Sequence, residues 1–249
     1  MLGILLIQAC VSSPSDTNWG KGSWPSMSKL GAAARTAATD PQTWVPIVGA
    51  GLLQIDNVDK RWTEDLIHDQ PLFGDDAEDW SDDLRDISTG AYVITALFAE
   101  SDSYGQKARG LAVGAGTMIL DGIASQGLKD LTGRERPDGS NDQSFPSGHA
   151  SKASSRTNMA IRNLADINLA DWQRSGATWA LHAVAAGTGL ARVEAAKHHL
   201  SDVMVGYAVG HFVSTFMYEA FMKDNAIDAQ LSFQGVERGG ALTLTIPLR

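Results

Sequence analysis

Residues 146–149 read Pro-Ser-Gly-His, and residues 192–202 read Arg-Val-Glu-Ala-Ala-Lys-His-His-Leu-Ser-Asp. Upstream of both stretches lie Lys129 and the dipeptide Arg136-Pro137. Together they supply permanent cations, imidazoles and a carboxylate, beside a serine and a glycine that let a backbone approach a ligand. Phosphoryl transfer depends mainly on positioning and on stabilising the charge of phosphate oxygens. These residues therefore predict a site that binds a phosphate and cleaves its ester bond without a metal ion.

The Pro-Ser-Gly-His stretch follows a polar segment, residues 130–144, which we expect to be a loop, and it opens an expected helix over residues 148–165. The free N–H groups of a helix's first turn bind anions well. Gly148 lets the backbone come close, Ser147 adds a hydroxyl donor, and His149 is placed to act as a general acid. The alternative is a Pro-Ser helix cap beside an incidental histidine.

His198 and Asp202 are four residues apart, so they share one face of the helix that we expect over residues 198–223. A carboxylate there can accept the Nδ1 proton of the imidazole, which leaves Nε2 free as a nucleophile. His199 is the competitor for this role, but its spacing directs it away from Asp202. The alternative is a histidine–aspartate pair on a helix surface.

Arg136 and Arg192 carry guanidinium groups, which match the geometry of a phosphate in a bidentate way that lysine cannot. Lys129, near the end of a long helix expected over residues 106–131, can add a point charge. For any one of these cations, a solvated surface charge is the simpler interpretation. That interpretation loses force when three of them bracket two histidines.

The order and spacing of the three stretches resemble the three-part signature of the type 2 phosphatidic acid phosphatase (PAP2) superfamily. The matching residues are Lys129-x6-Arg136-Pro137, Pro146-Ser147-Gly148-His149 and Arg192-x5-His198-x3-Asp202. The superfamily includes bacterial class A acid phosphatases, lipid phosphate and isoprenyl pyrophosphate phosphatases, and vanadium haloperoxidases. Two positions depart from its usual pattern: Ala191 stands where serine is usual, and His199 stands where many relatives carry an aromatic residue.

The resemblance implies an all-α helical bundle of the PAP2/haloperoxidase type, with the motifs at one end. It implies that His198 attacks phosphorus, that Asp202 orients His198, and that His149 protonates the leaving oxygen. It also implies that the phosphate oxygens are held by Lys129, Arg136, Arg192, Ser147 and the Gly148 N–H. No cofactor and no metal site are expected.

The composition fits one compact domain of 249 residues. The net charge of −9 disfavours nucleic acid as a partner, because that binding depends on neutralising phosphates. A local cluster of cations can still reverse the field inside a cleft. We interpret the acidic run over residues 75–83 as the solvated start of a helix.

The N-terminus resembles the end of a bacterial lipoprotein signal: residues 1–10 are apolar and end in Ala9-Cys10, and a polar tether follows over residues 11–25. No lysine or arginine precedes the apolar run, and the run is short for a signal. The alternative is a buried or frayed N-terminus. If Cys10 is lipidated, the protein is periplasmic or otherwise extracytoplasmic and anchored to a bacterial membrane.

The rest of the chain divides into a helical phosphatase domain, residues 26–228, and a C-terminal β-hairpin, residues 229–249, where apolar residues alternate with polar ones. We identify no convincing membrane span. The best candidate, residues 203–222, contains His211 and Glu219 and is expected to be a core helix.

These observations favour a metal-independent phosphatase that hydrolyses phosphomonoesters or pyrophosphates through a phosphohistidine. Lipid phosphates are plausible substrates if Cys10 anchors the domain at a bilayer. One alternative is a vanadate-dependent haloperoxidase, because vanadate mimics phosphate. Another is a non-catalytic lipoprotein that binds an anionic lipid, although a binder needs the cations and not both histidines.

Overall fold

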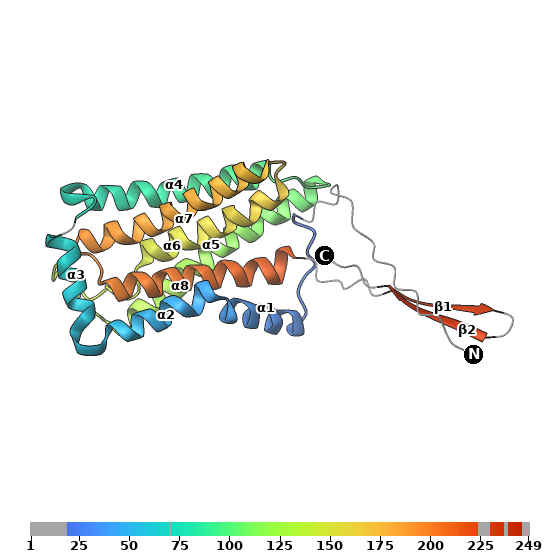
Figure 1. The fold of residues 1–249 in the computed structure, drawn as a ribbon, viewed down its shortest axis with the longest axis horizontal. Coiled ribbons are helices and arrows are strands. Elements are labelled where there is room, and N and C mark those ends of the chain that lie inside the picture. The colour runs from blue at the N-terminus through green and yellow to red at the C-terminus, as the bar shows by residue number, and fades with distance from the viewer. Residues whose placement is uncertain (1–18, 70, 224–229, 237–238, 246–249) are drawn as a thin grey trace.

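The computed structural model describes residues 19–69, 71–223, 230–236 and 239–245. The longer helices run side by side along the long axis of a bundle, and shorter helices cover one side and one end (Figure 1). The α-helices in the described residues are α1 (Met27–Thr39), α2 (Pro41–Leu53), α3 (Val58–His68), α4 (Ala77–Phe98), α5 (Tyr104–Thr132), α6 (Gly148–Asn163), α7 (Asp171–Glu194) and α8 (Leu200–Met217). The prediction of an all-α bundle is confirmed.

Helix α6 lies at the centre of the bundle and packs against α4, α5, α7 and α8. Most of its buried side chains are small, among them Ala150, Ala153 and Ala160. Small side chains let neighbouring backbones approach closely. The start of α6, which carries the Ser-Gly-His sequence, is therefore fixed from several sides.

Helices α8 and α6 approach each other closely. A Cβ atom on Gly206 would overlap the carbonyl oxygen of Ser147, and one on Gly210 would overlap the carbonyl oxygen of Ser151. Both oxygens belong to backbone, which cannot move aside as a flexible side chain can. These glycines therefore set how α8 sits on the first turns of α6.

Local capping residues set several of the helix boundaries. Asp40 caps α2 by accepting a hydrogen bond from the Gln42 N–H at 2.9 Å, with Pro41 at the first helical position. Helix α5 ends at Gly133, whose φ of 53° lies in the left-handed region that glycine tolerates. The polar loop predicted next to this helix separates α5 from α6.

The predicted helix start at His198 is wrong. Helix α8 begins at Leu200, and the preceding turn folds back so that the His198 N–H donates to the Arg192 carbonyl at 3.3 Å. The Asp202 carboxylate accepts a hydrogen bond from the His199 N–H at 2.8 Å, which caps the helix two residues later than expected. After Met217 the helix continues as one π-helical turn over Tyr218–Met222.

Near the C-terminus, strands β1 (Gln230–Val236) and β2 (Gly239–Thr245) pair antiparallel, with Leu231 opposite Leu244. Cys10 and most of the predicted tether lie outside the described residues, as do the last four residues of the chain.

Large apolar side chains are exposed on the outer faces of several helices. They include Trp44, Val45, Ile47, Val48 and Leu52 on α2, Ile87, Val93, Ile94, Leu97 and Phe98 on α4, and Ile119, Ile123 and Leu131 on α5. Helix α5 meets the length and hydropathy criteria for crossing a membrane, with only 28% of its most apolar window buried. By length and composition, this helix is a candidate span, which the sequence analysis did not single out.

The α6–α8 contact predicts opposite effects for two Gly→Ala substitutions. Gly210→Ala should lower the free energy of unfolding by about 1–3 kcal/mol, because the added methyl group overpacks the interface. Gly176→Ala, in open space on α7, should raise it by up to about 1 kcal/mol through helix propensity. Chemical denaturation followed by circular dichroism measures both. Equal effects of the two substitutions would contradict the close-packed interface.

Candidate active site

The three motifs lie at the end of α5, at the start of α6 and in the turn between α7 and α8, and these segments contact one another at one end of the bundle. Burial lowers the pKa of His198 well below its usual value, and the positive charges of Lys129, Arg192 and Arg136 lower it further. All three cations therefore act on one imidazole. The structure brings these predicted residues together around His198.

His198 is almost completely buried, and its Nδ1 lies 2.6 Å from the main-chain carbonyl oxygen of Ser144. A carbonyl oxygen can only accept a hydrogen bond, so Nδ1 carries the proton. The other ring nitrogen, Nε2, then keeps its lone pair. The lowered pKa favours the neutral ring, which is the form that a nucleophile requires.

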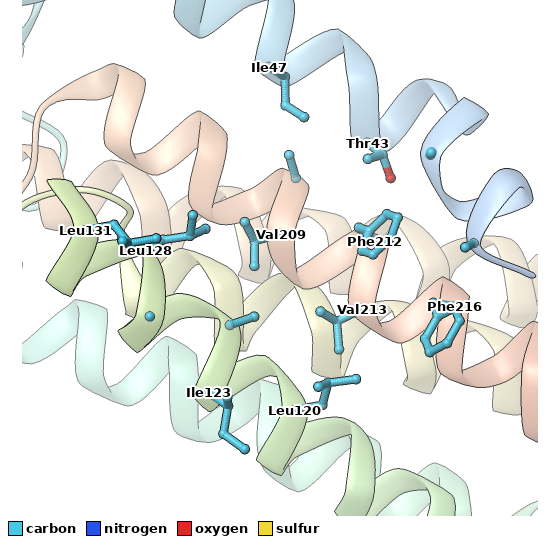
Figure 2. A pocket seen from close by; sticks show the side chains of 15 residues that line it. Thr43, Ile47, Leu120, Ile123, Leu128, Leu131, Val209, Phe212, Val213 and Phe216 are labelled. Atoms are coloured by element: carbon cyan, nitrogen blue, oxygen red, sulfur yellow. The ribbon is translucent and has the colours of Figure 1, made fainter. Parts of the chain in front are cut away.

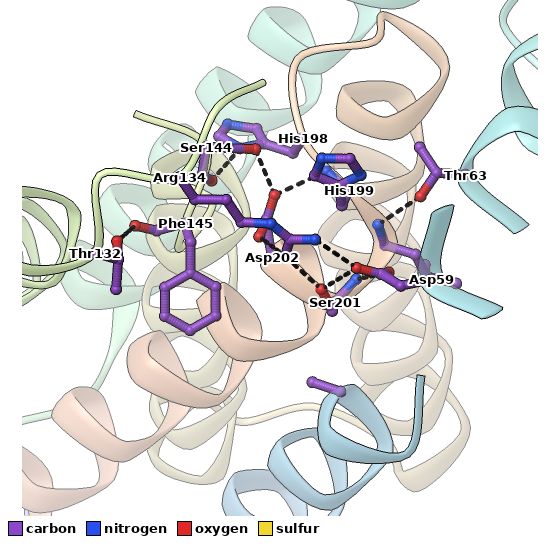
Figure 3. A network of polar contacts seen from close by, with 12 residues as sticks. Asp59, Thr63, Thr132, Arg134, Ser144, Phe145, His198, His199, Ser201 and Asp202 are labelled. Carbon is purple, nitrogen blue, oxygen red and sulfur yellow. Dashed lines mark hydrogen bonds and ion pairs between the residues drawn. The ribbon is translucent and has the colours of Figure 1, made fainter. Parts of the chain in front are cut away.

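Asp202 does not orient His198 directly, so that prediction is wrong in its geometry. The Asp202 side chain is fully buried and accepts hydrogen bonds from the Ser144 hydroxyl at 2.5 Å and from the His199 N–H at 2.8 Å. Asp202 therefore acts on His198 through Ser144, because the Ser144 main-chain carbonyl is the partner of Nδ1 of His198 (Figure 3). The reason is the late start of α8, which leaves His198 outside the helix.

Arg134 contacts the motif residue Asp202, and the sequence analysis missed it because it lies outside the three motifs. Its guanidinium lies 2.6 Å from the Asp202 carboxylate and 2.8 Å from that of Asp59 on α3. Asp59 also accepts from the Ser201 N–H at 2.9 Å and from the Ser201 hydroxyl at 2.5 Å. Burial alone would raise the pKa of Asp59, but the bonds from Ser201 and Arg134 outweigh it and lower that pKa.

Ser147 and Gly148 open α6 as predicted. The Ser147 hydroxyl accepts a hydrogen bond from the Ala150 N–H at 3.4 Å, and the Ser147 N–H donates to the Asp202 carbonyl at 2.9 Å. A hydroxyl that accepts at a cap can still donate its own proton. A Cβ built on Gly148 would lie 3.7 Å from Cε of Lys129, so the lysine passes directly beside this helix start.

The cations have few partners within the described part of the protein. Lys129 donates to the Gln143 carbonyl at 2.5 Å, and burial together with the Arg136 charge lowers the pKa of Lys129 to about 8. Arg192 donates to the Ser81 hydroxyl at 3.3 Å. The Nε atoms of Arg136 and Arg192 are buried and have no hydrogen-bond partner among the described residues. These groups suit an anionic ligand, which could satisfy several donors at once.

His149 contacts two residues of α4 that the sequence did not single out for the site. Its Nε2 lies 2.8 Å from the Asp82 carboxylate and 2.7 Å from Nη1 of Arg85. Burial and the Arg192 charge lower the pKa of His149 to about 4, against the opposing effect of Asp82. The acidic run opens α4 and is mostly exposed, as interpreted. Two of its members also reach the site: Asp82 contacts His149, and Glu78 lies 3.3 Å from Lys197 and 3.8 Å from Arg192.

Among the described residues, no group of three or more His, Cys, Asp or Glu side chains is arranged to hold a metal ion.

Comparison with known proteins agrees with the motif analysis. Residues 110–226 match the family model of the PAP2 superfamily, and this range contains all three motifs. The resemblance drawn from those motifs is confirmed: the region that carries them matches the PAP2 superfamily.

Among solved structures, the chain is similar to the crystal structure described as the first transmembrane PAP2 type phosphatidylglycerolphosphate phosphatase, from Bacillus subtilis. The two chains are 18% identical, with a TM-score of 0.46, over 77% of this chain and 94% of that one. No curated protein matches the chain significantly.

The Arg134 network predicts a large loss of stability on Arg134→Ala. The substitution leaves the buried carboxylates of Asp59 and Asp202 without their cation, which should lower the free energy of unfolding by about 3 kcal/mol. Arg134→Lys should recover part of this loss because it restores the charge without the forked geometry. Chemical denaturation of the three proteins checks the order, and an unchanged midpoint for Arg134→Ala would contradict the network.

Proposed function

We propose that this protein is a metal-independent phosphatase that hydrolyses phosphomonoesters or pyrophosphates through a phosphohistidine on His198. The observation that carries the proposal is the state of His198. Its Nδ1 proton is committed to the Ser144 carbonyl, and three cations act on the ring. A neutral imidazole facing a cationic pocket is what attack on a phosphoryl group requires.

In the first step, the Nε2 lone pair of His198 forms a bond to phosphorus while the bond from phosphorus to the leaving oxygen breaks. His149 gives a proton to that oxygen, which leaves as an alcohol or, from a pyrophosphate, as a phosphate. Lys129, Arg136, Arg192 and the first-turn N–H groups of α6 stabilise the negative charge on the phosphoryl oxygens.

In the second step, His149 is neutral and takes a proton from a water molecule as the water oxygen attacks phosphorus. The phosphorus–nitrogen bond breaks, and its electron pair returns to Nε2 of His198. Inorganic phosphate leaves, and both histidines regain their starting protonation states. His149 thus donates a proton in the first step and accepts one in the second, and His198 accepts the phosphoryl group in the first step and releases it in the second.

His198→Ala should abolish turnover, lowering kcat by at least about 10³-fold, because the bond to phosphorus can no longer form. Rapid acid-free quenching with a 32P-labelled substrate should trap label on the wild-type chain and none on the variant. His182→Ala, at a histidine that packs against Trp179 on α7, is the matched control and should keep full activity. Labelling of the His198→Ala chain at the wild-type level would overturn the phosphohistidine.

We also propose that the substrate carries a hydrocarbon chain, so that the phosphatase acts on lipid phosphates. The support is an apolar groove of about 860 Å³ between α2, α5 and α8 (Figure 2). Its walls include Ile47 from α2, Leu128 from α5 and Phe212 from α8. Burial of apolar surface contributes about 25 cal/mol per Å², so such a groove favours a hydrocarbon over a polar molecule.

The groove runs along α5 and α8 toward the catalytic end of the bundle. Leu128 and Leu131 line it on either side of Lys129 in sequence, and Leu120 lies about three turns further along α5. From Leu120 to Leu131 the helix rises about 16 Å, which accommodates a long alkyl or isoprenyl chain. A chain seated there would have its phosphate end at the side of α5 that carries Lys129.

Gly127→Leu tests the groove directly. Gly127 lines the groove, and a side chain there would meet open space, so leucine should occupy the volume without disturbing the fold. We expect kcat/KM for a long-chain lipid phosphate to fall at least about 10-fold, with p-nitrophenyl phosphate hydrolysis unchanged.

Gly122→Leu, which also meets open space on α5 and lies outside the groove lining, is the matched control. Equal kcat/KM values for the lipid substrate in the two variants would show that the groove does not hold the chain.

We further propose an extracytoplasmic location with a lipid anchor on Cys10 and a tether over residues 11–25. The sequence ending in Ala9-Cys10 supports the anchor. The exposed apolar side chains of α2, α4 and α5 support contact with a lipid phase. An anchored domain would meet its lipid substrates at the membrane surface.

A further inference from the structure

The proposed reaction needs a general acid, and the residues around His149 go beyond what the motif signature assigns. Three polar atoms form a closed triangle at this side chain. Nε2 of His149 lies 2.8 Å from Oδ1 of Asp82 and 2.7 Å from Nη1 of Arg85, and those last two atoms lie 2.6 Å apart. The triangle joins the start of α6 to the middle of α4.

Arg85 is itself held in place on the α4 surface. Its Nε donates to the Asp86 carboxylate at 3.0 Å, and the Asp86 and Asp82 charges raise the pKa of Arg85. The guanidinium is therefore always a donor and always a cation. With Arg85 fixed beside it, the Asp82 carboxylate has a defined direction toward the imidazole.

We propose that Asp82, held by Arg85, is the positioning residue of the general acid His149. An ionised carboxylate only accepts hydrogen bonds, so a bond between Asp82 and Nε2 requires the proton of His149 on Nε2; Nη1 of Arg85 then donates to Asp82 and is only a close neighbour of Nε2. The nitrogen that exchanges a proton with the leaving oxygen is then Nδ1. This role rests on the proposed phosphatase function, because a residue that positions an acid has meaning only where a leaving group needs a proton.

The same arrangement serves both halves of the reaction. In the first half, His149 is an imidazolium that donates Nε2–H to Asp82 and gives its Nδ1 proton to the leaving oxygen. In the second half, Nε2–H still donates to Asp82, and the free Nδ1 lone pair accepts a proton from water. Asp82 stays ionised throughout, and no proton passes through it.

The surrounding charges make such a partner necessary. Besides Asp82 and Arg85 from α4, His149 faces Arg192 from α7 and has Lys129 from α5 beside its neighbour Gly148. On its own helix, Lys152 and Arg156 follow within two turns, and from α8 the Asp202 main-chain carbonyl holds Ser147. Most of these groups are cations, which disfavour an imidazolium. The carboxylate of Asp82 is the anion in direct contact with the ring.

The test compares two substrates that differ in how much they need a general acid. The p-nitrophenolate of p-nitrophenyl phosphate leaves without protonation, whereas the alkoxide of an alkyl phosphate does not. Asp82→Asn keeps the size of the side chain and removes its charge. We expect kcat/KM for the alkyl phosphate to fall at least about 100-fold and that for p-nitrophenyl phosphate to fall less than about 10-fold.

The pH profile gives a second readout. Removing the Asp82 charge lowers the pKa of His149, so protonated His149 is lost at a lower pH. The alkaline limb of the kcat profile with the alkyl phosphate should therefore move to lower pH in Asp82→Asn. A residue with a merely structural role would lower activity at every pH without moving this limb.

Asp83→Asn, on the exposed side of the same acidic run, is the matched control and should leave both substrates and the pH profile unchanged. Adding Asp82→Asn to His149→Ala should have no further effect, because the residue that it positions is gone. Equal losses for the two substrates in Asp82→Asn, or additive losses in the double variant, would overturn the positioning role. Absence of any phosphatase activity in the wild-type protein would instead overturn the proposed function.

Discussion

The Asp202 carboxylate is the interaction on which the site depends, because it ties together three segments that are distant in sequence. One oxygen accepts from Arg134 in the loop after α5, and the other accepts from Ser144 before α6 and from the His199 N–H at the start of α8. A buried carboxylate is strongly unfavourable unless donors surround it. The fold can bury Asp202 only when all three segments are in place, so assembly of the site and burial of this charge occur together.

The carboxylates around the site also explain how an acidic protein holds a cluster of cations. Lys129, Arg136 and Arg192 repel one another, and burial adds a desolvation cost to Lys129 and Arg192. Carboxylates surround the cluster without occupying it: Glu78 lies at the outer side of Arg192, and Asp59 and Asp202 hold Arg134. The net charge of the chain is −9, yet the pocket is locally positive. Donors fixed in advance around a charged group stabilise it without reorganisation during the reaction.

The sequence was sufficient to predict the bundle, the helix start at Gly148 and the gathering of the motif residues around His198. It was insufficient for contacts between elements. The spacing of His198 and Asp202 suggested one helical face, but the cap that Asp202 makes with His199 starts α8 after His198. Arg134 and Asp82 gave no local signal, because their roles come from Asp59 on α3 and from His149 on α6. Periodicity reports which face of an element a residue occupies, and tertiary packing decides what that face meets.

The two histidines illustrate how the second partner of an imidazole sets its chemistry. The Ser144 carbonyl at Nδ1 of His198 is neutral, so it fixes the tautomer and adds no full charge that would stabilise a protonated ring. In the proposed role, the Asp82 carboxylate at Nε2 of His149 is an anion that holds the proton on Nε2 and opposes the lowering of the His149 pKa by burial and by the Arg192 charge. A neutral acceptor suits a nucleophile, which must keep a lone pair, and a charged acceptor suits an acid, which must carry a proton. In the proposed mechanism, one cationic pocket thus holds two imidazoles in opposite roles. The difference comes from the hydrogen-bond acceptor of each ring, the Ser144 carbonyl for His198 and the Asp82 carboxylate for His149.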